Sequence, residues 1–397
     1  MIYGTDGITA RRLTAEEHFE ADIISHIAFH MRMEDPEKVR AESVRMTAED
    51  WGAFGPEGKM MARIIRHRFE CRMNGRVIRN GGIGAVSTLP EFRNTGAIRA
   101  IFSELLPAAR RDGEVISTLY PFSHAFYRKF GYETVCPKAV YEFAPGALKE
   151  YRFDGTAEQW KPGEDLGVWL DLYHAFAAGY NLSIQRSAES FRKAHFEGLY
   201  YRDRKFAYLL RNGGEPAAYV IFQDIRHDPA AILKVEDLAW KGRDGLRAVL
   251  GFLSRFSADY GTIQLPLPNG LELYSLIHSP DAYGISKRTE QGYMIRVVNA
   301  QKLLETLPLP GGASFSIRIT DELLPENDGV WTVENGAAAR TENQPDLAVN
   351  IRTLGQLAAG GISLAEAEYK EDVTVYGNRE ILERVFTRRP ILVQDQF

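Results

Sequence analysis

The feature that most restricts the fold of this chain is a glycine-rich run that leads through a tight turn into a helix. Residues 81–88 read Gly-Gly-Ile-Gly-Ala-Val-Ser-Thr, a strand with an unusual share of glycine. Glycine weakens a strand interior and often marks a bulge or a close approach by a ligand. A turn follows at 93–96, and apolar residues at helical spacing predict a helix over 97–111. This order of elements predicts an α/β unit.

The turn and the first helical residues form a candidate phosphate site. Backbone N–H groups at a helix start bind phosphate oxygens, and Arg93 and Arg99 add positive charge. The alternative is a turn in which glycine serves only the backbone geometry, and composition alone favours neither interpretation. Pro107 is expected to kink or shorten the helix that follows.

The remaining sequence predicts elements of the same mixed kind. A helix is expected over 14–33, with Thr14 as its N-cap and Glu17 completing a capping box. Asn74-Gly75 predicts a hairpin turn between strands within 60–87.

Two more regions follow this first α/β unit. Residues 151–295 repeat its order of elements with little sequence identity. Residues 296–397 include alternating apolar positions at 315–319 and close with short helices, which predicts an α+β domain.

Length, composition and charge limit the class of protein. The 397 residues predict two or three domains, and a 45% share of hydrophobic residues is ordinary for a globular protein. The net charge of −5 argues against a nucleic-acid footprint. Cys71 and Cys136 are too few for a disulfide framework or a Cys-rich zinc site. Since no apolar run or N-terminal signal suits a membrane, we expect a cytoplasmic protein that binds neither nucleic acid nor membrane.

Three short runs lie close together in the sequence: Leu89-Pro-Glu-Phe-Arg-Asn-Thr-Gly-Ala-Ile-Arg-Ala100, Pro121-Phe-Ser123 and Phe126-Tyr-Arg-Lys-Phe-Gly-Tyr132. Together they resemble the enhanced-intracellular-survival acetyltransferases. Within the first run, Arg93-x-x-Gly96-x-Ile98 is similar to the R/Q-x-x-G-x-G/A pyrophosphate loop of the GNAT superfamily. Ile98 departs from that pattern at a position where the resembling family accepts a bulky residue.

The resemblance implies an α/β (α+β) architecture of three domains. It comprises an active GNAT domain at 1–150, a second, degenerate GNAT-like domain at 151–295 and a sterol-carrier-protein-like domain at 296–397. In the second domain, the run 240–247 stands in the position of the phosphate turn but carries Gly242 and Arg247 where an arginine and a small residue are wanted. One acetyl-CoA site per chain is therefore expected.

The resemblance also implies roles for individual residues, with acetyl-CoA as co-substrate and no metal. The residues implied to bind the cofactor are Val86, Ser87, Thr88, Arg93, Asn94, Thr95, Gly96, Ala97, Ile98, Arg99, Phe122 and Ser123. Tyr127 corresponds to the family's general acid, and the C-terminal carboxylate, here on Phe397, to its general base.

Elementary chemistry is consistent with these implied roles. An amine acceptor arrives mostly as ammonium, with a pKa near ~10, and must lose a proton before it attacks a thioester. An α-carboxylate, with a pKa near ~3.5, is a weak base unless it is desolvated. The apolar run 390–393 predicts that the chain end is buried. A phenol can protonate the leaving thiolate, and a strand amide near Val86 can stabilise the oxyanion.

Other polar residues receive plainer interpretations. His26 and His30 have i,i+4 spacing but no acidic or Cys partners in pattern, so no metal is expected there. His124 is interpreted as a surface or packing residue, and Asp395 equally as a solvated charge or as a group that attracts a cation. The arginines from Arg63 to Arg79 are interpreted as a solvated strand face, with a role at the CoA phosphates as the alternative.

The predicted function is acetyl transfer from acetyl-CoA to a primary amine of the aminoglycoside, polyamine or lysine type. Two alternatives remain. One is lipid or sterol binding by residues 296–397. The other is aminoacyl transfer from charged tRNA, against which the low basic content argues. A homo-oligomer is expected, and the family resemblance implies a hexamer.

Overall fold

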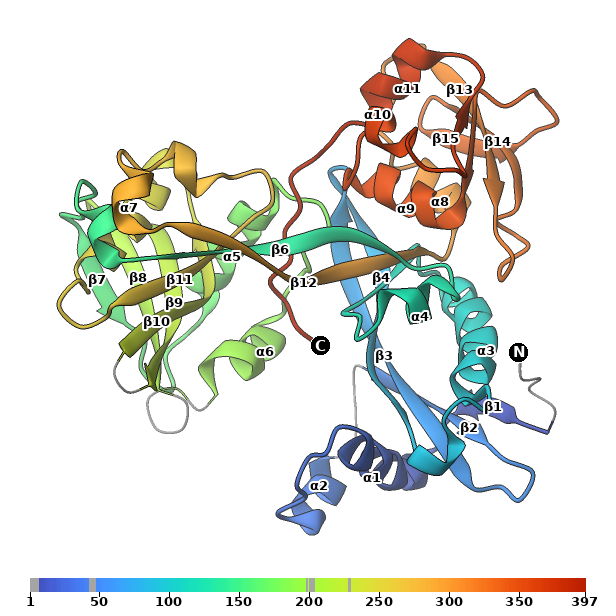
Figure 1. Cartoon of the computed structure of the whole chain (residues 1–397), viewed down its shortest axis with the longest axis horizontal. Helices are drawn as coiled ribbons and strands as arrows, with labels where there is room; N and C mark the ends of the chain where they lie inside the picture. Colours follow the sequence, from blue (N-terminus) through green and yellow to red (C-terminus); the bar gives the residue numbers. More distant parts are fainter. Residues whose placement is uncertain (1–6, 43–47, 198, 200–203, 228–229) are drawn as a thin grey trace. The chain divides into compact units, whose positions relative to one another are not determined.

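The computed structural model describes residues 7–42, 48–197, 199, 204–227 and 230–397. The chain divides into two compact units (Figure 1). The first comprises Met1–Val135, Gly292–Arg388 and Asp395–Phe397, and the second comprises Cys136–Gln291 and Arg389–Gln394. The chain end therefore belongs to the same unit as the predicted acetyl-CoA site. The domain boundaries at 150 and 295 stay predictions.

The first unit contains a mixed sheet with the strand order β1-β2-β3-β4-β5-β12. Its strands are β1 (Thr9–Arg12), β2 (Ala48–Phe54), β3 (Met60–Met73), β4 (Arg76–Thr88), β5 (Ile116–Leu119) and β12 (Ser286–Val297). Neighbouring strands are antiparallel except β4 and β5, which are parallel because α3 connects them. The predicted hairpin turn joins β3 to β4, where Asn74 and Gly75 both have positive φ.

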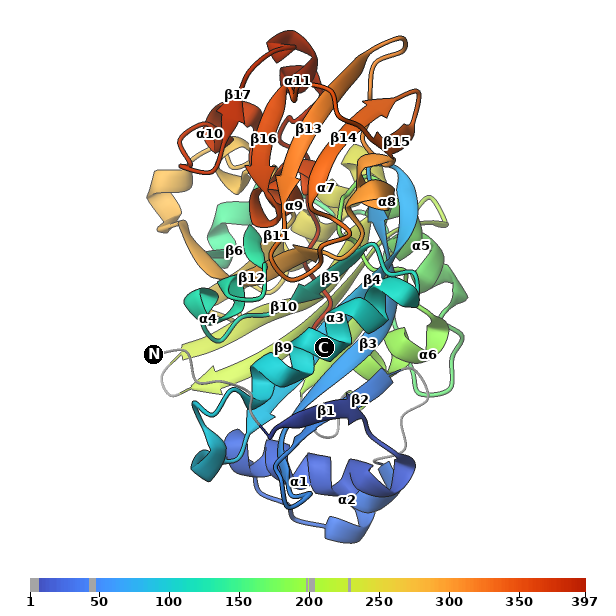
Figure 2. The same cartoon turned by 90° about the vertical axis from the view of Figure 1, so that its right-hand side faces the viewer.

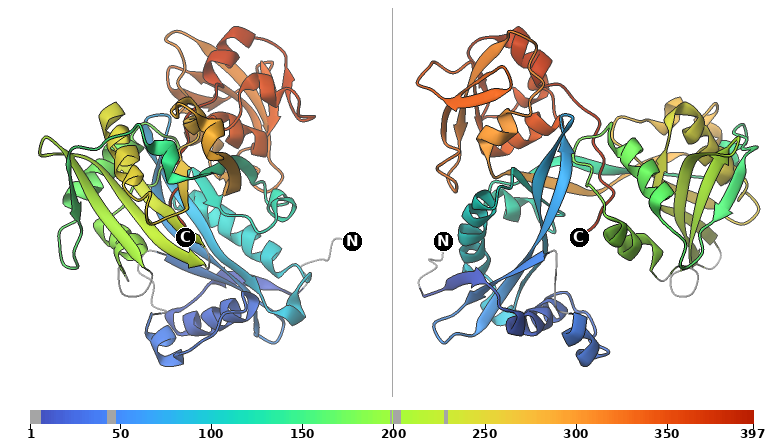
Figure 3. Two further views of the ribbon diagram at one scale, coloured as in Figure 1. Left: turned by 60° about the vertical axis from the view of Figure 1, so that its left-hand side comes forward. Right: turned by 180° about the vertical axis from the view of Figure 1, so that it is seen from behind.

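Four helices accompany this sheet: α1 (His18–Ala28), α2 (Pro36–Glu42), α3 (Ala97–Arg111) and α4 (His124–Arg128). Successive strand residues point to opposite faces. Phe54 packs in the cluster that includes Ile24 of α1, whereas its neighbour Ala53 packs in the cluster of α3. The helices α1 and α3 therefore cover opposite faces of the sheet, as the views in Figure 3 allow the reader to follow.

Three details of these helices can be compared with the sequence predictions. The Thr14–Glu17 capping box forms, but the α-helix that follows it ends at Ala28 rather than near residue 33. The helix predicted over 97–111 is present as α3 (Ala97–Arg111), and Pro107 therefore does not shorten it.

The interpretation of the arginines from Arg63 to Arg79 as a solvated strand face is wrong for Arg63 and Arg66, whereas Arg68, Arg76 and Arg79 are exposed. The side chains of Arg63 and Arg66 are 1% and 0% exposed. Arg63 pairs with Asp22 of α1 and Asp50 of β2. Burial of a charge requires compensating partners, and the chain supplies them from distant positions in sequence.

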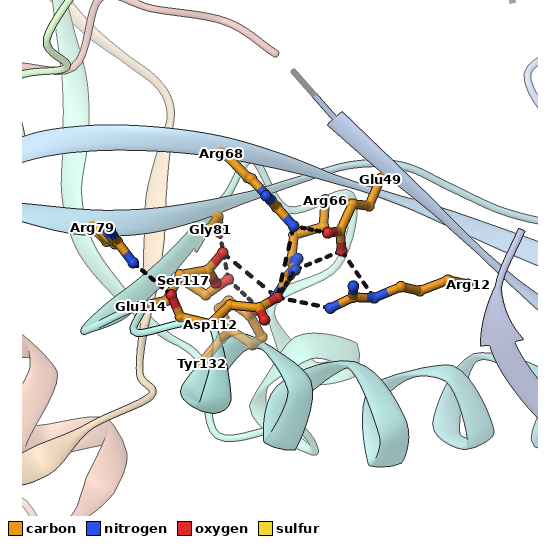
Figure 4. A network of polar contacts seen from close by, with 10 residues as sticks. All are labelled: Arg12, Glu49, Arg66, Arg68, Arg79, Gly81, Asp112, Glu114, Ser117 and Tyr132. Carbon is orange, nitrogen blue, oxygen red and sulfur yellow. Dashed lines mark hydrogen bonds and ion pairs between the residues drawn. The ribbon is translucent and has the colours of Figure 1, made fainter. Parts of the chain in front are cut away.

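Arg66 lies at the centre of a second charged network (Figure 4). It pairs with Glu49 at 2.5 Å and with Asp112, and its Nη1 lies 3.5 Å from Glu114 Oε1. The carboxyl of Glu114 is almost fully buried, and this desolvation raises its pKa to about 7 despite the nearby Arg66 cation. Glu114 thus titrates near neutral pH.

A second sheet in the first unit has the order β15-β14-β13-β16-β17 (Figure 2). Its strands are β13 (Ser314–Thr320), β14 (Gly329–Glu334), β15 (Ala337–Arg340), β16 (Leu347–Asn350) and β17 (Thr374–Val375). The associated helices are α8 (Ala300–Leu304), α9 (Ile351–Ala359), α10 (Leu364–Ala367) and α11 (Arg379–Val385). The alternation predicted at 315–319 is present in β13, where Phe315, Ile317 and Ile319 are buried.

Polar contacts join this α+β region to the first sheet. Arg296 of β12 pairs with Asp321 at 2.8 Å, and both side chains are fully buried. Arg110 of α3 donates to Asn327 Oδ1 at 2.8 Å. The α+β region is therefore packed on the sheet that carries the predicted site.

The second unit has the strand order β6-β11-β10-β9-β8-β7. Its strands are β6 (Glu133–Phe143), β7 (Thr156–Gln159), β8 (Lys205–Asn212), β9 (Glu215–His227), β10 (Ala230–Trp240) and β11 (Thr262–Leu267). The helices are α5 (Gly167–Ala177), α6 (Ala188–Phe191) and α7 (Gly242–Ser254). One hydrophobic core holds them together and includes Leu392 of the C-terminal segment.

Candidate functional site

The strand β4 is distorted where the cofactor was predicted to bind. Arg63 pairs with Ser87 and Ile65 pairs with Gly84, so two residues of β4 oppose a single residue of β3. This is a β-bulge, and Ala85 within it has φ +47°, a left-handed conformation that non-glycine residues rarely adopt. The bulge interrupts the regular pairing at Ala85 and Val86, and the carbonyl of Ala85 accepts a hydrogen bond from Ser87 Oγ at 3.1 Å.

The pairing of strands β4 and β5 ends just before the bulge of β4. Their last paired residues are Ile83 and Leu119, yet β4 continues to Thr88. The end of β4 therefore has β3 on one side and no β5 partner on the other.

A cavity of about 970 Å³ opens at this end of the sheet, and most of the predicted cofactor residues line it. These are Val86, Ser87, Thr88, Arg93, Asn94, Gly96, Ala97, Ile98, Arg99 and Phe122. The other two predicted residues are used in local turns. Thr95 Oγ1 donates to the carbonyl of Phe92 at 2.8 Å, and Ser123 Oγ caps α4 by accepting from Phe126 N at 3.3 Å.

The start of α3 has the properties of an anion site. Its N-cap is Gly96, with φ +94° and no side-chain cap, and its first turn contains no acidic residue. Uncapped N–H groups at a helix start favour bound phosphate oxygens. Arg93 is exposed and Arg99 partly exposed at the cavity. These donors and charges fit the pyrophosphate of a coenzyme A molecule.

Tyr127 lies behind the cavity wall rather than in its lining. Its side chain is buried, and burial raises the pKa of its phenol above the ordinary value. Its ring centroid lies 5.2 Å from those of Phe122 and Phe126, which both line the cavity. His124, which precedes it on α4, is exposed, in agreement with its surface interpretation.

Phe397 lies against β3 and β4, where the chain end is marked in Figures 1 and 3. Its ring centroid is 4.9 Å from that of Phe69 and 5.8 Å from that of His67. A Cβ atom at Gly82 would lie 2.7 Å from the Phe397 ring, and one at Gly84 would lie 3.4 Å from its carboxyl carbon. The glycines of β4 therefore provide the space that Phe397 occupies.

The burial predicted for the run 390–393 is confirmed for its last three residues, whereas Pro390 is exposed. Ile391, Leu392 and Val393 are all shielded from solvent. Asp395 is partly buried, and its backbone carbonyl accepts hydrogen bonds from two tyrosines.

Several residues near the site were not identified from the sequence. Phe29, Phe92, Phe126, Lys129 and Phe130 also line the cavity. Phe92, Phe126, Lys129 and Phe130 fall within the motifs of the family resemblance, so their positions in sequence are a usable signal. His67, Phe69, Tyr120 and Tyr293 surround Phe397, and no sequence pattern connects them to the chain end.

The corresponding turn of the second unit differs from the anion site of α3. The helix α7 begins at Gly242 and carries Asp244 in its first turn, where a carboxylate would repel a phosphate. Nowhere in the described ranges do three His, Cys, Asp or Glu side chains gather in a way that could hold a metal ion. Within the same ranges no helix has the length and hydropathy to cross a membrane.

Comparisons with known proteins agree with this geometry. Residues 9–135 match the acetyltransferase (GNAT) domain family, and residues 300–393 match the sterol carrier protein domain family. No curated protein matches the sequence. The mixed α/β architecture, with a GNAT domain and a sterol-carrier-protein-like domain, is therefore confirmed.

Solved structures share this fold over nearly the whole chain. A conserved protein of Enterococcus faecalis V583, described as a probable N-acyltransferase, has a TM-score of 0.85 at 23% identity and covers 98% of this chain and 100% of its own. A GCN5-related N-acetyltransferase from Anabaena variabilis has a TM-score of 0.82 at 19% identity, with coverages of 97% and 100%. Eis1 from Mycobacterium abscessus has a TM-score of 0.81 at 19% identity, with coverages of 98% and 100%.

Proposed function

We propose that this chain transfers the acetyl group of acetyl-CoA to a primary amine. The premise is that it is an acyltransferase with a GNAT domain and a sterol carrier protein domain. The GNAT domain supports acetyl-CoA as the co-substrate, which supplies an activated thioester. The cavity at the bulge of β4 and the start of α3 would hold it, with the pyrophosphate on the turn 94–99.

The α-carboxylate of Phe397 is the proposed general base. It takes a proton from the acceptor ammonium, directly or through water, and the resulting amine attacks the thioester carbonyl carbon. Four aromatic rings pack against the partly buried side chain of Phe397 and hold the chain end beside β4.

Two further groups are proposed to act on the thioester, one on its carbonyl oxygen and one on its sulfur. The backbone N–H of Val86, in the bulge, is proposed to stabilise the negative charge that develops on the carbonyl oxygen. Tyr127 is proposed to donate its phenolic proton to the sulfur as the C–S bond breaks, which releases CoA as the thiol. The proton that the new C–N bond leaves on the nitrogen passes to solvent, and solvent returns a proton to the Tyr127 phenolate. The raised pKa of Tyr127 keeps the phenol protonated at neutral pH.

One observation carries this proposal. Gly84 stands beside the carboxyl carbon of Phe397, and Val86 and Ser87, two and three residues further along the same strand, line the cavity. The acceptor class remains a primary amine of the aminoglycoside, polyamine or lysine type, and the chains are expected to form a homo-oligomer.

The test alters the chain end and measures turnover. A short neutral tag added after Phe397 converts its carboxylate into an amide, and deletion of Phe397 moves the carboxylate back by about 3.3–3.6 Å. Both changes should strongly reduce acetyl transfer to a saturating amine, measured as thiol release, because a general base must lie within hydrogen-bond reach of its proton.

Controls separate loss of the base from loss of the fold. Calorimetry should show that the tagged and shortened proteins bind CoA as the wild type does. Phe397→Leu keeps the carboxylate in place and should retain most of the turnover. A tagged protein with full activity would remove Phe397 from the mechanism.

A further inference from the structure

Two tyrosines hold the last residues of the chain through one backbone carbonyl. Tyr120 donates from its hydroxyl to the carbonyl oxygen of Asp395 at 2.9 Å, and Tyr293 donates to the same oxygen at 2.7 Å. The side chain of Tyr293 is buried and that of Tyr120 is partly buried. Both lone pairs of this carbonyl thus have a partner.

The sheet places the two tyrosines next to each other. Antiparallel pairing of β5 and β12 sets Leu119 opposite Met294, so Tyr120 and Tyr293 follow as the next pair along the two strands. Their ring centroids are 4.8 Å apart, and each lies 5.9 Å from the ring of Phe397. They stand at the point where β5 ends and separates from β4.

We propose that Tyr120 and Tyr293 are positioning residues, which fix the terminal carboxylate of Phe397 at the distance that proton transfer requires. This inference rests on the proposed role of Phe397 as the general base. A chain end normally frays, whereas a base must keep its oxygen within a few tenths of an ångström of a productive position. The two hydrogen bonds to the carbonyl of Asp395, two residues before Phe397, restrict the motion of the chain end and so fix the position of its carboxylate.

The choice of acceptor atom supports a positioning role. The hydroxyls bind the carbonyl of Asp395 and so use none of the lone pairs of the Phe397 carboxylate. A phenol bound directly to that carboxylate would stabilise its charged form and weaken it as a base. The arrangement therefore holds the chain end through a neutral carbonyl rather than through the carboxylate that is proposed to act.

The test removes one or both hydroxyls and keeps the rings. Tyr120→Phe and Tyr293→Phe should each lower kcat by about 10-fold and the double variant by about 100-fold, while the KM for acetyl-CoA stays unchanged. Added formate, as a free carboxylate base, should partly restore kcat in the double variant and leave the wild type unchanged. A structural role alone would produce no such rescue.

Carboxypeptidase A gives a readout that is independent of activity. Release of Phe397, followed by mass spectrometry, should be faster in both single variants than in the wild type. Tyr173→Phe is the matched control, because the buried Tyr173 hydroxyl also donates to a backbone carbonyl, that of Ile184 at 2.8 Å, in the second unit. It should change neither kcat nor the release of Phe397.

Two outcomes separate this inference from the proposed function. If the tagged protein is inactive while the double tyrosine variant keeps wild-type kcat, the positioning role is overturned and Phe397 remains the base. If the double variant raises the KM for acetyl-CoA and leaves kcat unchanged, the tyrosines serve cofactor binding and the inference is likewise overturned.

Discussion

At the scale of single residues, burial decides which side chains can take part in proton transfer. Tyr127 is 2% exposed, and desolvation raises its pKa, so the phenol carries its proton throughout the neutral range. The same physical effect raises the pKa of Glu114, whose carboxyl lies beside the buried Arg66. These two shifts lead to different measurements, one of turnover and one of stability.

Replacement of Tyr127 by Phe should lower kcat by roughly 10²–10⁴-fold with a saturating amine, the usual range for loss of a general acid. The KM for acetyl-CoA should change little, because the ring still packs beside Phe122 and Phe126. Tyr132→Phe is the control, since its buried hydroxyl contacts Ser117 at 2.7 Å and its loss should affect stability rather than turnover. Equal kcat values for Tyr127→Phe and the wild type would reject the assignment.

Glu114 makes the stability of the protein depend on pH. Its pKa rises from 4.5 to about 7 on folding, so between these values the folded state binds more protons than the unfolded state. The free energy of unfolding should therefore fall as pH rises through this window. Glu114→Gln removes the titration, and the wild type should lose about 1–3 kcal/mol relative to this variant between pH 5 and pH 8. Urea unfolding at both pH values measures the difference, and a constant difference would contradict it.

At the scale of elements, three consecutive parts of the chain form the cavity wall: the bulge of β4, the turn after it and the start of α3. The bulge interrupts the strand pairing at Val86, and the turn presents the uncapped N–H groups of α3 to the same cavity. Both features come from residues within about twenty positions of each other. Ten of the residues that the family resemblance implied as cofactor contacts line this cavity, and their role in binding the cofactor stays a prediction.

Gly96→Glu should abolish CoA binding measured by calorimetry. Gly96 has φ +94°, and a carboxylate at the start of α3 would occupy the phosphate position and repel the ligand. Gly58→Glu is the matched control, because Gly58 also has positive φ, +76°, but has open space around it in the turn between β2 and β3. That variant carries the same backbone strain and should bind CoA normally. Unchanged affinity in Gly96→Glu would exclude this turn from the site.

At the scale of the whole molecule, the C-terminal segment belongs in turn to both compact units. Residues Arg389–Gln394 lie in the second unit, where Asn181 bonds through its backbone to Pro390 and Leu392. Residues Asp395–Phe397 return to the first unit and to β4. The last residues of the chain thus leave the sterol carrier protein domain and pack against β4 of the GNAT domain.

The sequence by itself determined the mixed α/β architecture and the hairpin at Asn74-Gly75, because the order of the elements and the turn depend on near neighbours in the chain. The residues implied to bind the cofactor came from the family resemblance. It could not determine the burial of Arg63 and Arg66. An arginine-rich strand looks solvated in the sequence, and the carboxylates that pair with these two arginines come from separate elements. Nor could it connect Tyr120, Tyr293 and His67 with Phe397. Those contacts join residues that are 104 to 330 positions apart in the sequence. Only the pairing of β5 with β12, and the space left by the glycines Gly82 and Gly84 of β4, bring them together.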